Sequence, residues 1–266
     1  MKYACVITNL LDLWEQPRFN SGRVNQLLFG IPVRVEKEKD SYCLVEEPGG
    51  YQGWGHRNGL VEISQRDYRV AVRRTNAVVT SAGGARLFDP RVNKQADPFF
   101  VYYGTPLSVT SWRDPYAFVI LPSGATFRVK QSRITPTKAK GEPRVTGNQL
   151  VAEAKRFLGV PYLWGGITNA GFDCSGLVQT ICRRFGISIP RDTKDQISIG
   201  EPVVRDDVAT GDLLFFDRHV GFAIGRQRLI HASIAGNGVR IHSLDPDSEI
   251  YREDLNRTFQ QARRIL

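Results

Sequence analysis

The sequence predicts an α+β protein in which two small all-β barrels precede a domain of helices followed by an antiparallel sheet. Three observations carry this prediction. Short apolar stretches separated by Gly, Pro and Asn fill residues 1–66, and a weaker version of the same pattern fills residues 67–135. Residues 148–266 show apolar residues at helical spacing and then consecutive apolar runs bounded by glycines.

The first predicted barrel, residues 1–66, contains apolar stretches at 3–8, 31–36 and 42–46, with turn residues between them. It ends in the segment Tyr51-Gln52-Gly53-Trp54-Gly55. Together with the turn glycines, this closing Gly-Trp segment resembles bacterial SH3-like domains.

The second predicted barrel, residues 67–135, repeats this theme, because residues 103–109 parallel residues 29–35. Two apolar stretches flank Pro122-Ser123-Gly124 and predict a hairpin. An insertion is expected around residues 81–98. Residues 136–147 are polar, basic and proline-bearing, which predicts a linker.

The C-terminal domain, residues 148–266, is expected to begin with helices. One helical stripe ends at Gly159, and a second is followed by Gly186, which suits a left-handed cap. Strands are expected in the apolar runs 213–216, 220–224, 229–232 and 239–241.

The net charge of +9 suggests attraction to polyanions, but no Lys/Arg run exceeds two residues. We therefore expect a generally basic surface, which would suit an acidic wall-derived substrate, and no nucleic-acid partner. The four cysteines show no CxxC spacing, so neither a structural zinc site nor a disulfide framework is expected, and no metal or cofactor is predicted. Cys182 is expected to pack in the core.

No apolar stretch approaches the length of a membrane span, and the N-terminal apolar run is too short for a secretory signal. The expected location is the cytoplasm if Met1 is the native start, and otherwise the periplasm or cell wall. A reduced compartment fits the cysteine pattern.

Cys174 stands where the second helix is expected to start. Unpaired backbone N–H groups and the helix dipole would stabilise a thiolate there and lower the thiol pKa. Core packing is the alternative, but the polar neighbours Asp173 and Ser175 favour a surface site. With His219 and His231 downstream as bases, the hypothesis is a cysteine peptidase.

Six sequence blocks then stand in a characteristic order. They are Tyr162-Leu163-Trp164-Gly165-Gly166, Asp173-Cys174-Ser175-Gly176-Leu177, Pro190-Arg191-Asp192, Gly211-Asp212-Leu213-Leu214-Phe215-Phe216, His219-Val220-Gly221 and Ile230-His231-Ala232-Ser233. This order resembles the NlpC/p60 cysteine peptidases. The resemblance implies a compact papain-like fold and peptidoglycan stem peptides as substrates.

With SH3-like domains in front, the chain resembles the γ-D-glutamyl-L-diamino acid endopeptidases of that family, which release L-Ala-γ-D-Glu from stems with a free N-terminal alanine. The resemblance makes Cys174 the nucleophile, His219 its base and later the acid, and His231 the group that orients His219. It makes Tyr162 a possible oxyanion donor. A core histidine or core tyrosine is the structural alternative at these positions.

The expected substrate contacts come partly from the resemblance. A buried α-ammonium needs anionic and hydroxyl partners, and the resemblance assigns Asp173, Tyr51 and Glu15 to it. The alternatives are a barrel-packing tyrosine at residue 51 and a solvated turn glutamate at residue 15.

The α-carboxylate of D-Glu is expected to meet Ser175 and Arg191, although Arg191 could instead serve a structural ion pair. Trp164 is expected to line the cleft, with core packing as the alternative. His56 and His242 fit no motif, so surface or turn roles are expected for both.

The chain departs from the family at Asp217-Arg218, where many members carry a longer loop before the histidine. Three other functions stay open at this point: a hydrolase acting on intact, glycan-linked peptidoglycan, an inactive wall-binding module, and an acyltransferase. The presence of Cys174, His219 and His231 argues against the inactive module.

Overall fold

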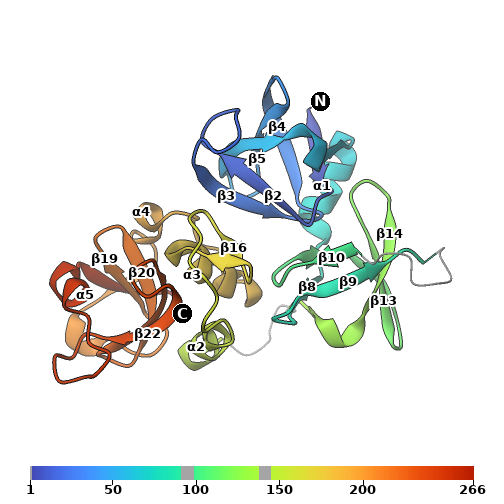
Figure 1. Ribbon diagram of the computed structural model, residues 1–266. Helices are drawn as coiled ribbons and strands as arrows, with labels where there is room; N and C mark the ends of the chain where they lie inside the picture. Colours follow the sequence, from blue (N-terminus) through green and yellow to red (C-terminus); the bar gives the residue numbers. More distant parts are fainter. Residues whose placement is uncertain (1, 91–98, 138–144) are drawn as a thin grey trace. The chain divides into compact units, whose positions relative to one another are not determined.

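The protein is described by a computed structural model covering residues 2–90, 99–137 and 145–266 (Figure 1). The chain forms two compact units, residues 1–137 and 138–266. The α+β architecture predicted from the sequence is confirmed: the first unit is mainly strands, and the second combines helices with a sheet. None of the helices in the described ranges is both long and apolar enough to cross a membrane.

The first part of the N-terminal unit is a seven-stranded antiparallel sheet. Its order is β3(Arg23–Leu28)-β2(Leu10–Trp14)-β6(Gln52–His56)-β5(Tyr42–Glu46)-β4(Pro32–Lys39)-β1(Tyr3–Val6)-β7(Leu60–Glu62), and the short 3₁₀ helix η1 (Arg57–Gly59) precedes β7. Alternate residues of these strands form one apolar core that includes Leu13, Val33 and Val45, each fully buried.

Helix α1 (Gln65–Arg74) follows; it was not expected, and none of its residues is fully buried. A five-stranded sheet has the order β10(Phe99–Val101)-β9(Ala85–Phe88)-β14(Thr126–Lys130)-β13(Tyr116–Ile120)-β12(Val109–Arg113). A three-stranded sheet has the order β11(Pro106–Leu107)-β8(Ala77–Val79)-β15(Ile134–Pro136), with η2 (Gln131–Arg133) before β15. The hairpin predicted around residues 122–124 is present as β13 and β14.

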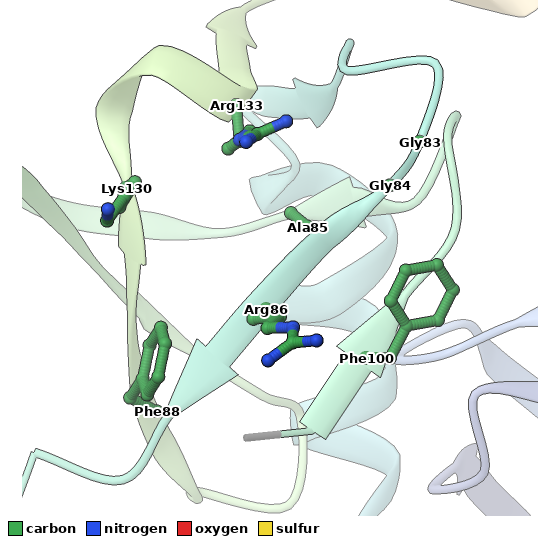
Figure 2. Close-up of a pocket in the computed structure, with 8 residues that line it drawn as sticks. All are labelled: Gly83, Gly84, Ala85, Arg86, Phe88, Phe100, Lys130 and Arg133. Carbon is green, nitrogen blue, oxygen red and sulfur yellow. The ribbon is translucent and has the colours of Figure 1, made fainter. Parts of the chain in front are cut away.

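Part of the insertion expected at 81–98 and part of the linker expected at 136–147 lie outside the described residues. A cavity of about 400 Å³ opens beside the five-stranded sheet. Figure 2 shows the residues that line it. Arg86, Lys130 and Arg133 line it together with the rings of Phe88 and Phe100, and its described lining contains no acidic residue. Part of the chain's positive charge is therefore concentrated at this hollow.

The C-terminal unit starts with α2 (Gly147–Lys155), which Thr146 and Gln149 close with a reciprocal capping box. The short strands β16 (Ile167–Thr168) and β17 (Gly171–Phe172) lead into α3 (Cys174–Arg184), which is followed by α4 (Thr193–Gln196). Gly186 has φ +76° after α3, as the predicted left-handed cap requires.

A six-stranded antiparallel sheet completes this unit in the order β18(Glu201–Val203)-β23(Gln261–Arg264)-β19(Leu213–Phe216)-β20(His219–Ile224)-β21(Arg228–Ser233)-β22(Gly238–Ser243). The 3₁₀ helix η3 (Arg205–Asp207) precedes β19, and α5 (Glu253–Thr258) precedes β23. Helix α3 packs against β20 and β21. This packing brings the start of α3 to the strands that carry the predicted histidines.

Candidate active site

The start of helix α3 is held by Asp173, its N-cap. The Asp173 carboxylate accepts a hydrogen bond from the backbone N–H of Gly176 at 2.6 Å. A Cβ atom at Gly176 would lie 2.2 Å from the carbonyl oxygen of Gly166, so only glycine fits here. The glycine-rich turn before the helix therefore lies directly against the turn of helix that bears Cys174.

Asp173 also forms a buried ion pair with Arg191. The guanidinium donates through Nη2 to Oδ2 at 2.6 Å and through Nη1 to Oδ1 at 3.0 Å. The backbone N–H of Gly165 and the hydroxyl of Ser175 also donate to this carboxylate, at 2.9 and 3.4 Å. All the donors named here belong to the protein, and they occupy both carboxylate oxygens.

This network bears on three predicted substrate residues. Of the two readings open for Arg191, the ion pair is the one present, and Arg191 also donates to the Ser175 hydroxyl at 2.9 Å. Asp173, Ser175 and Arg191 are all buried. Their contacts with the amine or the carboxylate of a substrate stay predictions.

Cys174 is a buried residue, 7% exposed, and its sulfur lies 3.8 Å from the hydroxyl oxygen of Thr193. Burial raises the thiol pKa, and the nearby Asp173 charge raises it further. Hydrogen bonds from the Thr193 hydroxyl and from the backbone of Val220 and Ser175 act in the opposite direction without overcoming burial.

The sequence predicted a lowered pKa for the Cys174 thiol, and this prediction is wrong, because the pKa is raised. The helix dipole acts over one turn, whereas removal from water penalises the whole charge of a thiolate. Cys174 consequently remains a neutral thiol until a base removes its proton.

Thr193, at the start of α4, was missed by the sequence analysis. The one feature of the sequence that could have drawn attention to Thr193 is its position directly after the Pro190-Arg191-Asp192 block. Gln196, on the same short helix, is fully buried and donates to the carbonyl oxygens of Ser175 and Pro190. Gln196 thus holds α4, and with it Thr193, against the start of α3.

The three histidines His219, His231 and His242 form a row across β20, β21 and β22. His219 Nε2 lies 2.6 Å from His231 Nδ1, and His231 Nε2 lies 2.8 Å from His242 Nδ1. Successive rings are nearly perpendicular, at 80° and 76°. The structure thus brings together His219 and His231, as predicted.

Gly221 makes room for this row. A Cβ atom at Gly221 would lie 2.9 Å from the Cβ of His231, so a larger residue on β20 would displace the His231 ring. Val220, between His219 and Gly221, provides the backbone hydrogen bond to the Cys174 sulfur. His219 therefore stands next in the chain to a residue that contacts the Cys174 sulfur. Its Nδ1 is the ring nitrogen not engaged by His231.

The surface or turn role expected for His242 is wrong. His242 lies within β22, and the hairpin register pairs His231 with Arg240. Residues 240 and 242 share one face of the strand, so His242 meets His231 on the diagonal. If residues 234–237 are taken as the turn of a hairpin, the resulting strand register places residue 242 diagonally opposite His231. The sequence could have indicated the contact in this way.

The three histidines of the row, His219, His231 and His242, are neutral at pH 7. Burial lowers the pKa of His219 to about 4, and it lowers that of His231 well below the ordinary value. Burial also lowers the pKa of His242, with the Arg252 charge as the next cause. A neutral His219 can accept a proton, which a base requires.

Tyr162 lies beside the residue that precedes Asp173, since it forms an isolated parallel bridge with Phe172. Burial raises the Tyr162 pKa, and the charges of Cys174 and Asp173 add to this. Its hydroxyl therefore stays protonated and can donate. Trp164 is 67% exposed, so it does not pack in a core.

Tyr51 and Glu15 belong to the N-terminal unit. The Tyr51 hydroxyl donates to the Val24 carbonyl oxygen at 3.2 Å, and Glu15 is exposed. Their predicted contacts with a substrate amine stay predictions.

The four cysteines are free thiols. Cys5, Cys43 and Cys182 have no exposed surface, in agreement with the core packing predicted for Cys182. Within the described ranges, no three or more His, Cys, Asp and Glu side chains are grouped so as to hold a metal ion.

Comparison with known proteins identifies the family. The profile of the NlpC/P60 family matches residues 159–257. The gamma-D-glutamyl-L-lysine dipeptidyl-peptidase of Bacillus subtilis is 31% identical over 246 residues, which covers 86% of this chain and 78% of the relative. The chain belongs to the NlpC/P60 family.

Two further comparisons extend over nearly the whole chain. Dipeptidyl-peptidase 6 of Lysinibacillus sphaericus is 28% identical over 265 residues and matches 96% of each chain. The crystal structure of an NlpC/P60 family protein from Bacillus cereus superposes with a TM-score of 0.86 at 26% identity, covering 99% of both chains.

The protein is thus an NlpC/P60 cysteine peptidase, and its N-terminal strands are consistent with SH3-like domains. Cys174 and the two predicted histidines all fall inside the matched family region.

Proposed function

We propose that this protein hydrolyses the bond between γ-D-Glu and the diamino acid of peptidoglycan stem peptides. The observation that carries the proposal is the arrangement at α3, where the residue next to His219 contacts the Cys174 sulfur and His219 Nε2 is held by His231. The substrate class is supported by the name of the Bacillus subtilis relative, a gamma-D-glutamyl-L-lysine dipeptidyl-peptidase.

The reaction begins with two neutral groups. The Cys174 thiol gives its proton to His219 Nδ1 while the sulfur attacks the carbonyl carbon of the D-Glu side chain. His219 becomes an imidazolium whose Nε2–H donates to His231 Nδ1. The Tyr162 hydroxyl donates to the oxyanion that forms on the substrate carbonyl.

The tetrahedral intermediate then collapses. The C–N bond breaks, and His219 gives the proton on Nδ1 to the leaving amine of the diamino acid. The remaining thioester is attacked by water, which loses a proton to His219. The acid product leaves, and the proton returns to the Cys174 sulfur.

The proposal also includes a requirement for a free N-terminal L-Ala on the substrate. It is supported by the names of two relatives, both dipeptidyl-peptidases. Tyr51, Glu15 and Asp173 are the proposed partners of the ammonium group. Since the Asp173 carboxylate already receives donors on both oxygens, its contribution is mainly its charge. A peptidase with this requirement would act on released fragments, as in muropeptide recycling.

The test is product analysis by mass spectrometry on three substrates: L-Ala-γ-D-Glu-diaminopimelate, the same peptide N-acetylated, and intact sacculi. We expect release of L-Ala-γ-D-Glu from the free peptide alone, and no turnover by Cys174→Ala. Turnover by that variant would overturn the cysteine mechanism.

The pattern of products separates the alternative functions. Efficient cleavage of sacculi would point to a remodelling hydrolase, and transfer to an added amine would point to an acyltransferase. Binding of sacculi without any product would point to a wall-binding module. Tyr51→Phe and Glu15→Gln should raise KM for the free peptide, and unchanged KM values would exclude these residues from amine recognition.

A further inference from the structure

The third member of the histidine row, His242, has no place in the reaction described above. Its Nδ1 lies 2.8 Å from His231 Nε2. We propose that His242 is a positioning residue, which fixes the tautomer of His231 and through it the tautomer of His219. The proposal deepens the proposed function and rests on it for its turnover assay.

The proton positions along the row follow from what a base must do. A neutral imidazole carries one N–H and one bare nitrogen. His219 can accept the thiol proton at Nδ1 only when its own proton is on Nε2. That proton points to His231 Nδ1 at 2.6 Å, so His231 Nδ1 must be bare. His231 then carries its proton on Nε2.

The same reasoning continues to the end of the row. His231 Nε2–H points to His242 Nδ1, which must also be bare, so His242 carries its proton on Nε2. In the reversed arrangement every proton moves to Nδ1, including that of His219. Nδ1 of His219, the nitrogen that would accept the thiol proton in the proposed reaction, would then be blocked. The row therefore has one productive direction, and His242 is its last member.

Burial makes the acceptor at His242 necessary. His231 is 1% exposed, so water does not replace a missing partner for its Nε2–H. Without an acceptor there, the form with the proton on His231 Nδ1 becomes favourable, because that N–H can donate to His219 Nε2. Loss of His242 would thus favour the blocked form of His219 without touching His219.

The surroundings of His242 keep its Nδ1 bare. The charged groups that act on it are Arg252 and Asp254, which pair with each other, and Arg240 of β22. Burial and the Arg252 charge together lower the pKa of His242, while Asp254 opposes them. If His242 were protonated, its Nδ1–H would face the Nε2–H of His231, and two donors would oppose each other.

The same alignment assists the proton transfer itself. When His219 becomes an imidazolium, the lone pair of His231 Nδ1 faces its Nε2–H, and the His242 lone pair polarises His231 in the same sense. A row of neutral rings so aligned partly replaces the carboxylate that orients histidine in other triads.

The experiment compares two substitutions at one position. His242→Leu removes the acceptor and keeps an apolar side chain of similar bulk. His242→Asn keeps an acceptor, because Oδ1 can occupy the place of Nδ1. We expect kcat to fall about ten- to a hundredfold in His242→Leu, with KM nearly unchanged, and His242→Asn to recover most of the loss. His56→Leu, in the N-terminal unit, is the control and should match the wild type.

Two kinetic outcomes would overturn the proposal. Wild-type kcat in His242→Leu would show that the third ring is dispensable. Equal losses in His242→Leu and His242→Asn would indicate a packing role instead. The pH dependence of kcat on the acidic side gives a further check. If it is the same in His242→Leu as in the wild type, His242 does not control which ring nitrogens carry protons.

A second measurement does not need turnover. ¹⁵N NMR of the full-length protein, with labelled histidine, reports which ring nitrogen carries hydrogen. The wild type should show Nε2–H tautomers for His219 and His231 at pH 7, and His242→Leu should shift His231 towards Nδ1–H. An Nδ1–H tautomer at His231 in the wild type would overturn the inference. If the wild type cleaves none of the peptides yet shows the expected tautomers, the proposed substrate fails and this inference stands.

Discussion

Arg191 binds both carboxylate oxygens of Asp173, and this bidentate contact is buried at the start of helix α3. The same carboxylate caps the helix at Gly176 and accepts the N–H of Gly165. One ion pair thus joins the nucleophile helix, the glycine-rich turn and the segment that leads to Thr193.

Replacing Arg191 by Met should therefore destabilise the C-terminal unit strongly. Removal of one partner from a buried pair leaves an unpaired charge, which costs about 3–5 kcal/mol. The measurement is urea-induced unfolding followed by a signal from this unit. Arg156→Met is the matched control, because Arg156 pairs with Glu153 on the surface of α2, where such pairs contribute about 0–1 kcal/mol. Similar effects of the two substitutions would contradict the role given to the Asp173–Arg191 pair.

Thr193→Val should slow the reaction without unfolding the protein. The substitution keeps the shape of the side chain and removes the hydroxyl that lies 3.8 Å from the sulfur and favours its thiolate form. We expect kcat/KM to fall about three- to tenfold, the value of one hydrogen bond. Thr193→Ser retains a hydroxyl and should remain near wild type; a loss equal to that of Thr193→Val would assign the effect to packing.

The histidine row should make the C-terminal unit sensitive to acid. Burial lowers the His219 pKa to about 4, whereas the unfolded chain titrates near pH 6.5. The unfolded state then binds more protons, so the stabilisation is complete above pH 6.5 and declines as the pH falls from there through about 4.

Hydrogen exchange of β20, β21 and β22, corrected for intrinsic rates, would measure this loss of stability between pH 7 and pH 5. His219→Asn removes one buried titrating ring and should flatten the dependence. An equally steep dependence in that variant would place the acid sensitivity elsewhere.

Gly176→Ala should be severely destabilising, because its Cβ would meet the Gly166 carbonyl oxygen at 2.2 Å, and backbone cannot move aside as a side chain can. We expect a cost of about 2 kcal/mol or more and a corresponding fall in melting temperature. Gly83→Ala is the control, since its Cβ would have no atom within 4 Å. If Gly176→Ala melts at the same temperature as Gly83→Ala, the backbone at Gly166 must be able to move away from α3 to accommodate the added methyl group.

Elements with a strong apolar pattern were predictable from the sequence. Helix α3 and strands β19 to β21 bury most of their residues, so their patterns are continuous. Strand β23 was missed because its sequence Gln-Ala-Arg-Arg contains one buried residue, Ala262, and it is recognisable only through its pairing with β19 and β18. The short helices α4 and α5 offer too few residues for a periodic pattern.

The contact between His219 and His231 was predictable from the sequence, but the pKa values at the site were not. Cys174, His219 and His231 lie where the family blocks place them, but the direction of the Cys174 pKa shift depends on burial, which a local helix argument omits. His242 depends on the register of β21 with β22, and Thr193 on how Gln196 holds α4. Those are tertiary contacts, without a local sequence signal.

Because Cys5, Cys43 and Cys182 are fully buried, Cys174 is a selective site for chemical labelling. An electrophilic probe small enough to enter would find one cysteine residue that is not fully buried, because the other three have an exposed fraction of 0%. Intact-protein mass spectrometry would then count competent molecules in a preparation, one adduct for each. A tag attached there would report on events at the start of α3 without any engineered substitution.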